Sequence, residues 1–124
     1  RIKLKYLDED NATRRAIAKR YISEIHNPEL RLPGSDFCAN SVHHIFPVLC
    51  KRRDELQRYL TGSGVQTIIH YPIPPHRQLC YAELGGLKLP VTERIHREEL
   101  SIPLNQTMPK EDVDKVIQLL NDFN

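Results

Sequence analysis

The sequence predicts an α+β domain in which a small, three-stranded, mainly antiparallel sheet packs against helices. Apolar residues near the C-terminal end recur at Val113, Val116, Ile117 and Leu120, a spacing typical of the buried face of a helix. Further upstream, short runs rich in β-branched and aromatic residues alternate with helical segments. Short strands mixed with helices in this way indicate an α+β fold.

Helices are expected at both ends of the chain. Residues 2–25 are expected to form a long N-terminal helix, because apolar residues recur at three- and four-residue steps. Asn11 and Arg14 interrupt this stripe, so we expect Leu4 and Leu7 to face something other than the core of this domain. The C-terminal amphipathic helix is expected to begin near Pro109, a residue that suits a first helical turn.

Strands and shorter helices are expected to alternate between these two helices. The expected strands cover residues 40–49, 65–71 and 100–103, and the expected helices cover residues 54–60, 77–82 and 91–98. Pro47 lies inside the first expected strand and lacks an amide donor, so it places that strand at a sheet edge or marks a bulge.

The size and composition of the chain indicate one ordinary globular domain. The 124 residues suit a single domain, and the apolar share of 40% and charged share of 27% are usual for such a protein. A net charge of +2 is too small to indicate a nucleic-acid partner, and no apolar run is long enough to cross a membrane. No signal peptide is visible, and the chain begins at Arg1 with no methionine, a start that suggests a piece of a longer protein.

The cysteines and paired histidines favour neither a disulfide framework nor a metal site. The three cysteines are Cys38, Cys50 and Cys80, an odd number without Cys-x-x-Cys spacing, which is typical of a reducing cytoplasm. His43 and His44 are adjacent, and on a strand they would point to opposite faces and could not bind one ion.

The most informative segment is a β-type run that ends in prolines. His70 and Tyr71 close the run, and the proline-rich stretch from Pro72 to Pro75 then holds His76 at a fixed distance. Proline fixes φ and removes amide donors, so this proline arm is expected to be a stiff loop, the kind of segment that often contacts ligands. The alternative is a rigid loop whose histidines are satisfied within the domain.

Other chemistries have little support in the sequence. There is no Gly-x-Gly-x-x-Gly motif, P-loop or Gly-x-Ser-x-Gly elbow, and three basic residues at 51–53 are typical of a solvated helix start. The arm from Pro72 to Arg77 matches the Pro-x-x-Pro-x-basic pattern of ligands for Src-homology-3 domains. A strand is expected directly before the prolines, in place of the disordered flank that such ligands usually have.

Five motifs lie in order along nearly the whole chain. They are Asn11 with Arg14 or Arg15 and then Ala18 and Tyr21; Val42-His43-His44-Ile45-Phe46; Arg53-Asp54-Glu55-Leu56 with Leu60; Gly64-Val65-Gln66-Thr67 with Ile69-His70-Tyr71-Pro72 and Pro75-His76; and Leu100-Ser101-Ile102-Pro103. In this order they resemble the C-terminal small domain of the DegT/DnrJ/EryC1/StrS family of sugar aminotransferases. Pro47 and Cys50 depart from the pattern, because the family's strand usually runs on with aliphatic residues there.

The resemblance implies half of an active site. Members of the family use pyridoxal phosphate to pass an amino group, usually from glutamate, to a keto-sugar nucleotide, and they work as homodimers in the cytoplasm. The Schiff-base lysine and most phosphate ligands lie in a large domain that this chain lacks, so no catalytic residue and no cofactor are expected in residues 1–124. The matching His-Tyr-Pro…His segment implies substrate-binding roles for His70, Tyr71 and His76.

Two hypotheses therefore remain. In the first, the chain is the substrate-side domain of a sugar-nucleotide aminotransferase. In the second, it is a non-catalytic interaction module that presents the arm between Pro72 and Pro75 to a protein partner.

Overall fold

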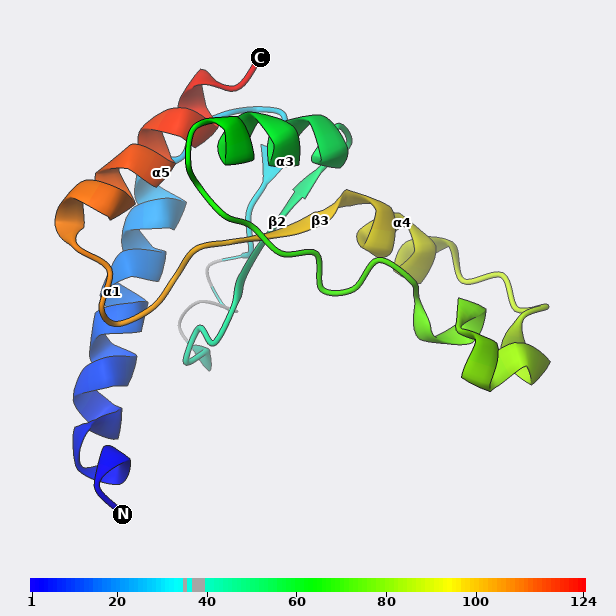
Figure 1. The fold of residues 1–124 in the computed structure, drawn as a ribbon, viewed down its shortest axis with the longest axis horizontal. Helices are drawn as coiled ribbons and strands as arrows, with labels where there is room; N and C mark the ends of the chain where they lie inside the picture. Colours follow the sequence, from blue (N-terminus) through cyan, green and yellow to red (C-terminus); the bar gives the residue numbers. More distant parts are fainter. Residues whose placement is uncertain (35, 37–39) are drawn as a thin grey trace.

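A computed structural model, which describes residues 1–34, 36 and 40–124, confirms the α+β fold (Figure 1). Three strands, β1 (Leu30–Arg31), β2 (Phe46–Cys50) and β3 (Glu99–Ile102), form an antiparallel sheet in the order β1-β2-β3. Helices α1 (Leu7–Glu24), α3 (Arg53–Gly62), α4 (Pro90–Glu98) and α5 (Lys110–Asp122) surround it, with 3₁₀ helices at Lys3–Tyr6, Pro75–Arg77 and Leu79–Leu84.

The core lies on one face of this sheet. Alternation along the strands turns Phe46, Val48 and Cys50 of β2 inward, together with Leu100 and Ile102 of β3. These side chains pack against buried apolar residues of α1, α3 and α5, which explains why the apolar stripes of these helices recur at helical spacing. Pro47 and Leu49 alternate with the inward residues and are only partly buried, so the opposite face of the sheet stays partly open.

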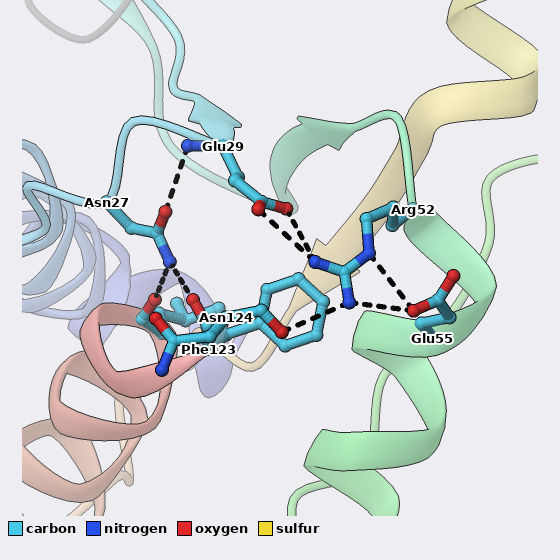
Figure 2. A network of polar contacts seen from close by, with 7 residues as sticks. Asn27, Glu29, Arg52, Glu55, Phe123 and Asn124 are labelled. Atoms are coloured by element: carbon cyan, nitrogen blue, oxygen red, sulfur yellow. Dashed lines mark hydrogen bonds and ion pairs between the residues drawn. The ribbon is translucent and has the colours of Figure 1, made fainter.

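Arg52 joins the beginning of α3 to two distant parts of the chain (Figure 2). Its guanidinium donates hydrogen bonds to the carboxylates of Glu29 and Glu55 and to the backbone carbonyl of Asn124, at 2.8–3.2 Å. It also lies 4.9 Å from the centre of the Phe123 ring, a cation–π contact. Together these contacts hold the C-terminal end of the chain beside the beginning of α3.

The strands differ from the sequence prediction in three places. The first expected strand, β2, begins at Phe46 and not at residue 40, because His43 adopts a φ of 50°, outside the range of a strand. The expected strand at residues 65–71 is wrong, because only Ile68 makes a bridge, to Ser101 of β3. The sheet also contains β1, a strand that was not predicted from the sequence. Pro47 suits its position, since β1 pairs only with Leu49 and Cys50 and leaves that part of β2 with one neighbour.

The helices follow the prediction more closely. The long N-terminal helix, the helix after residue 52, α4 and the C-terminal helix are all present, although the first residues form a 3₁₀ helix at Lys3–Tyr6. Residues 77–82, expected as one short helix, form parts of two 3₁₀ helices. None of the helices in the described ranges is long and apolar enough to span a membrane.

Two parts of the chain extend away from the core and carry exposed apolar side chains. The N-terminal end reaches down past the sheet, and residues 72–89, which we call the projecting segment, reach out beyond α4 (Figure 1). At the N-terminal end, Leu4 is 70% exposed and Leu7 is 44% exposed, as the interrupted stripe predicted. The projecting segment exposes Ile73, Leu79, Tyr81, Leu84, Leu87 and Leu89.

Candidate functional site

A groove on the open face of the sheet is the candidate site. It has a volume of about 490 Å³ and lies between the outer side of β2 and the helix α4. His70 and Glu99 line it together with two arginines, Arg31 and Arg94, whose side chains make no hydrogen bond or ion pair within the described ranges. The apolar part of the lining comes from Leu32, Pro33, Ile45, Pro47, Leu49 and Ile95.

His70 is held firmly in this groove by two residues of β3. Its backbone N–H donates to the Glu99 carboxylate at 2.7 Å, and its ring Nδ1 lies 2.8 Å from the Ser101 hydroxyl. The Ser101 hydroxyl in turn donates to the other Glu99 oxygen at 2.6 Å. The other ring nitrogen of His70, Nε2, has no hydrogen-bond partner among the residues described. His70 also lines a smaller hollow of about 170 Å³.

Tyr71 lies at the edge of the same site. Its side chain is exposed, and its ring meets that of His70 edge to face, with 5.4 Å between the ring centres. The segment that carries these two residues is not a strand, and their rings are in contact. The ring Nδ1 of His96 in α4 lies within hydrogen-bond distance of the Tyr71 carbonyl, which ties the segment to the helix.

His76 lies apart from the groove, at the base of the projecting segment. It is 3% exposed, and its Nε2 lies 3.2 Å from a Glu93 carboxylate oxygen in the first turn of α4. The same oxygen accepts hydrogen bonds from the Leu89 backbone N–H at 3.2 Å and from Arg77 at 3.3 Å. The Leu89 N–H, followed by the His76 ring, lowers the pKa of the Glu93 carboxyl.

Sequence reasoning missed Glu99 and Ser101. They lie 29 and 31 residues from His70, so spacing alone could not connect the three. A signal did exist, since Glu99 and Ser101 alternate with Leu100 and Ile102 along a strand in which all four residues are buried. Polar residues with a period of two in a buried strand indicate a second face with a polar function.

No lysine and no cluster of metal ligands contributes to this groove among the described residues. All seven lysines are exposed and none lines the groove, so the groove does not fit a cofactor bound through a Schiff base. A larger hollow of about 650 Å³ lies between the end of α3 and the start of α5 and includes Lys115, but none of the three predicted site residues lines it. No group of metal-ligating residues occurs in the described ranges; Cys38 lies outside them, and Cys50 and Cys80 are free thiols.

Comparison with known proteins shows the family. The sequence model of the DegT/DnrJ/EryC1/StrS aminotransferase family matches residues 1–121, and the chain therefore belongs to this family. The fold agrees, since the structure of S. venezuelae DesV in complex with a ketimine intermediate superposes with a TM-score of 0.90 at 34% identity, over 98% of this chain and 34% of that one.

Two curated relatives are similar in sequence over nearly all of this chain. The dTDP-3-amino-3,6-dideoxy-alpha-D-galactopyranose transaminase of Aneurinibacillus thermoaerophilus is 43% identical over 98% of this chain. The erythromycin biosynthesis sensory transduction protein EryC1 of Saccharopolyspora erythraea is 42% identical over 97% of it. The chain spans about a third of the length of these relatives, 34% in each case.

Proposed function

We propose that this chain is the C-terminal, substrate-side domain of an aminotransferase that passes an amino group from glutamate to a keto-sugar nucleotide. The observation that carries the proposal is the groove in which Glu99 and Ser101 hold His70, within a fold that superposes on a third of DesV over 98% of this chain. The named relatives include transaminases of dTDP-linked amino sugars, which supports this substrate class.

The cofactor, pyridoxal phosphate, belongs in this proposal to the rest of the longer protein. A solved relative, NtdA of Bacillus subtilis, carries the cofactor in its PMP form and is 32% identical over 94% of this chain. The cofactor supplies the electron sink when bound, and the protein supplies binding and orientation. Since the lysines of this chain are exposed and lie outside the groove, its own part is to bind and orient the substrate.

Three residues are proposed to contact the sugar nucleotide. His70 contributes its unpaired Nε2 in the groove, and the exposed Tyr71 ring lies beside it. His76 contributes Nδ1, which has no partner in the part described, because Glu93 occupies only its Nε2. The exposed leucines of the N-terminal end and the projecting segment are proposed to pack on the large domain and on a second subunit of a homodimer.

The experiment compares the two halves of the reaction in the longer protein. His76→Ala is expected to slow amino transfer to the keto-sugar nucleotide while the glutamate half-reaction stays nearly unchanged, because glutamate is too small to reach this residue. Loss of one hydrogen bond to the substrate corresponds to about 0.5–3 kcal/mol. His26→Ala, which alters an exposed histidine beyond the end of α1, is the matched control.

Equal loss in both half-reactions would give His76 a role in folding or cofactor binding instead. A second measurement tests the division of labour. This chain alone, incubated with pyridoxal phosphate and desalted, is expected to show no stoichiometric absorbance band from a lysine adduct. A band that survives and maps to one lysine would contradict the proposal.

A further inference from the structure

The relay of Glu99, Ser101 and His70 determines which nitrogen of the His70 ring carries the proton. Glu99 is 4% exposed, and no lysine or arginine forms an ion pair with its carboxylate among the described residues. Its two oxygens accept hydrogen bonds instead, one from the His70 backbone N–H and one from the Ser101 hydroxyl, at 2.7 and 2.6 Å. In both bonds the carboxylate is the acceptor, and the His70 N–H and the Ser101 hydroxyl are the donors.

The direction of the remaining hydrogen bond follows from this. The Ser101 hydroxyl has a single proton, and it is used in the bond to Glu99. Towards the His70 ring, 2.8 Å away, the hydroxyl oxygen can therefore only accept, and Nδ1 of His70 must carry the proton. In a neutral ring the proton on Nδ1 leaves Nε2 as the nitrogen with the lone pair.

We propose that Glu99 and Ser101 are positioning residues that fix His70 in the Nδ1–H tautomer, so that its Nε2 accepts a hydrogen bond from a hydroxyl group of the ligand in the groove. Nε2 is free for this role because it has no partner among the residues that the structure describes. The ligand part of this inference rests on the proposed function, in which a sugar supplies the hydroxyl. The tautomer itself rests on the three hydrogen bonds alone.

His76 provides an internal reference for the test. The Nε2 of His76 faces the Glu93 carboxylate, so the same reasoning places the proton on Nε2, the nitrogen that carries it in most neutral histidine side chains in water. The two histidines are therefore expected to be opposite tautomers in one molecule. Nitrogen-15 NMR of this chain, labelled at histidine and recorded above the pH at which the rings protonate, separates protonated from unprotonated ring nitrogens and reports both in one spectrum.

A change of one atom is expected to reverse the relay. In Glu99→Gln the side-chain oxygen must still accept from the His70 backbone N–H, so the new amide group faces Ser101 and donates to it. The Ser101 hydroxyl then donates to Nδ1, and His70 is expected to change to the Nε2–H tautomer. Ser101→Ala removes the hydroxyl and is expected to give the same change, while Ser101→Thr keeps the hydroxyl and is expected to retain the wild-type pattern.

The wild-type spectrum alone can overturn the inference, even if a variant fails to fold. His70 with its proton on Nε2, or a His70 pattern that Glu99→Gln and Ser101→Ala leave unchanged, would refute the relay. In the longer protein, Ser101→Ala is expected to raise KM for the keto-sugar nucleotide roughly two- to tenfold and to leave KM for glutamate unchanged, with recovery in Ser101→Thr. A confirmed tautomer with unchanged kinetics would contradict the ligand part and the groove's place in the proposed function, but not the relay.

Discussion

Replacing Glu93 by alanine tests how the projecting segment, residues 72–89, is held against α4. One oxygen of Glu93 accepts hydrogen bonds from Leu89, His76 and Arg77. Since the His76 ring is 3% exposed, its Nε2 would lose its partner where water hardly reaches. A buried polar group left without a partner costs about 1–3 kcal/mol, which raises the equilibrium for local opening roughly 5- to 140-fold.

Native-state hydrogen exchange, followed by mass spectrometry, measures this opening directly. Peptides from the projecting segment are expected to exchange faster in Glu93→Ala, while peptides from α1 and α5 keep their rates. The matched control is Glu83→Ala, because Glu83 is an exposed glutamate on the same segment and its side chain makes no hydrogen bond within the described ranges. Equal exchange in the two variants would refute the reasoning that Glu93 holds the segment.

The same contacts give the segment a defined pH dependence. The Leu89 N–H and then the His76 ring lower the pKa of Glu93 below its ordinary value of 4.5. A carboxyl with a lowered folded pKa contributes stability that is fully present above its unfolded value and is lost as the pH falls through the folded value. Local opening of the segment is therefore expected to increase below about pH 4.5, and Glu93→Gln, which cannot ionise, is expected to remove this dependence.

Two further predictions concern surface and core. The wild type is expected to self-associate weakly in sedimentation experiments, because burying two leucines yields only roughly 3–6 kcal/mol before the cost of association. Leu4→Ser/Leu7→Ser is expected to abolish this concentration-dependent association. A wild type that is monomeric at high concentration with an ordered N-terminal end would contradict this. Tyr21→Phe is expected to lower the free energy of unfolding, measured in urea, by about 1–2 kcal/mol, because the buried Tyr21 hydroxyl donates to the Pro103 carbonyl at 2.8 Å. The control is Tyr59→Phe, which is expected to change this free energy by less than about 0.5 kcal/mol, because the Tyr59 hydroxyl makes no hydrogen bond in the described part. Similar losses of unfolding free energy in the two variants would contradict a stabilising role for the hydrogen bond between Tyr21 and Pro103.

The helices could be predicted from the sequence because their apolar faces are local patterns. Val113, Val116 and Ile117 mark α5 wherever the rest of the chain lies, and all three are buried as expected. The strands depend on partners far away in the sequence. β1 has only two residues, too few to show any period, and it exists because Leu30 and Arg31 meet the end of β2.

The error at residues 65–71 has a related cause. Val65, Ile68 and Ile69 are good strand formers, and on composition alone they predict a strand. The open part of β3 offers the segment only one pairing position, at Ser101, and the prolines that follow have no amide to continue a ladder. Local preference was therefore overridden by the number of available partners.

The prediction of the candidate site was limited for the same reason. His70, Tyr71 and His76 are close together in the sequence, so a local motif could select them as candidates. The residues that determine what His70 can do, Glu99 and Ser101, reach it only through the bridge that places Ile68 beside Ser101. No pattern within the segment of His70 contains that information.

The burial of Glu99 is better explained by its effect on His70 than by a contribution to stability. Stability alone favours an apolar residue at this position, because a buried carboxylate without a cationic partner loses its hydration, and buried charges are often replaced without loss of stability. The orientation of the His70 proton, in contrast, requires an acceptor at Glu99 and a hydroxyl at Ser101. Glu99→Gln is therefore expected to unfold at the same urea concentration as the wild type or a higher one, although it reverses the His70 tautomer. A marked loss of stability with an unchanged tautomer would instead make Glu99 a residue of the fold.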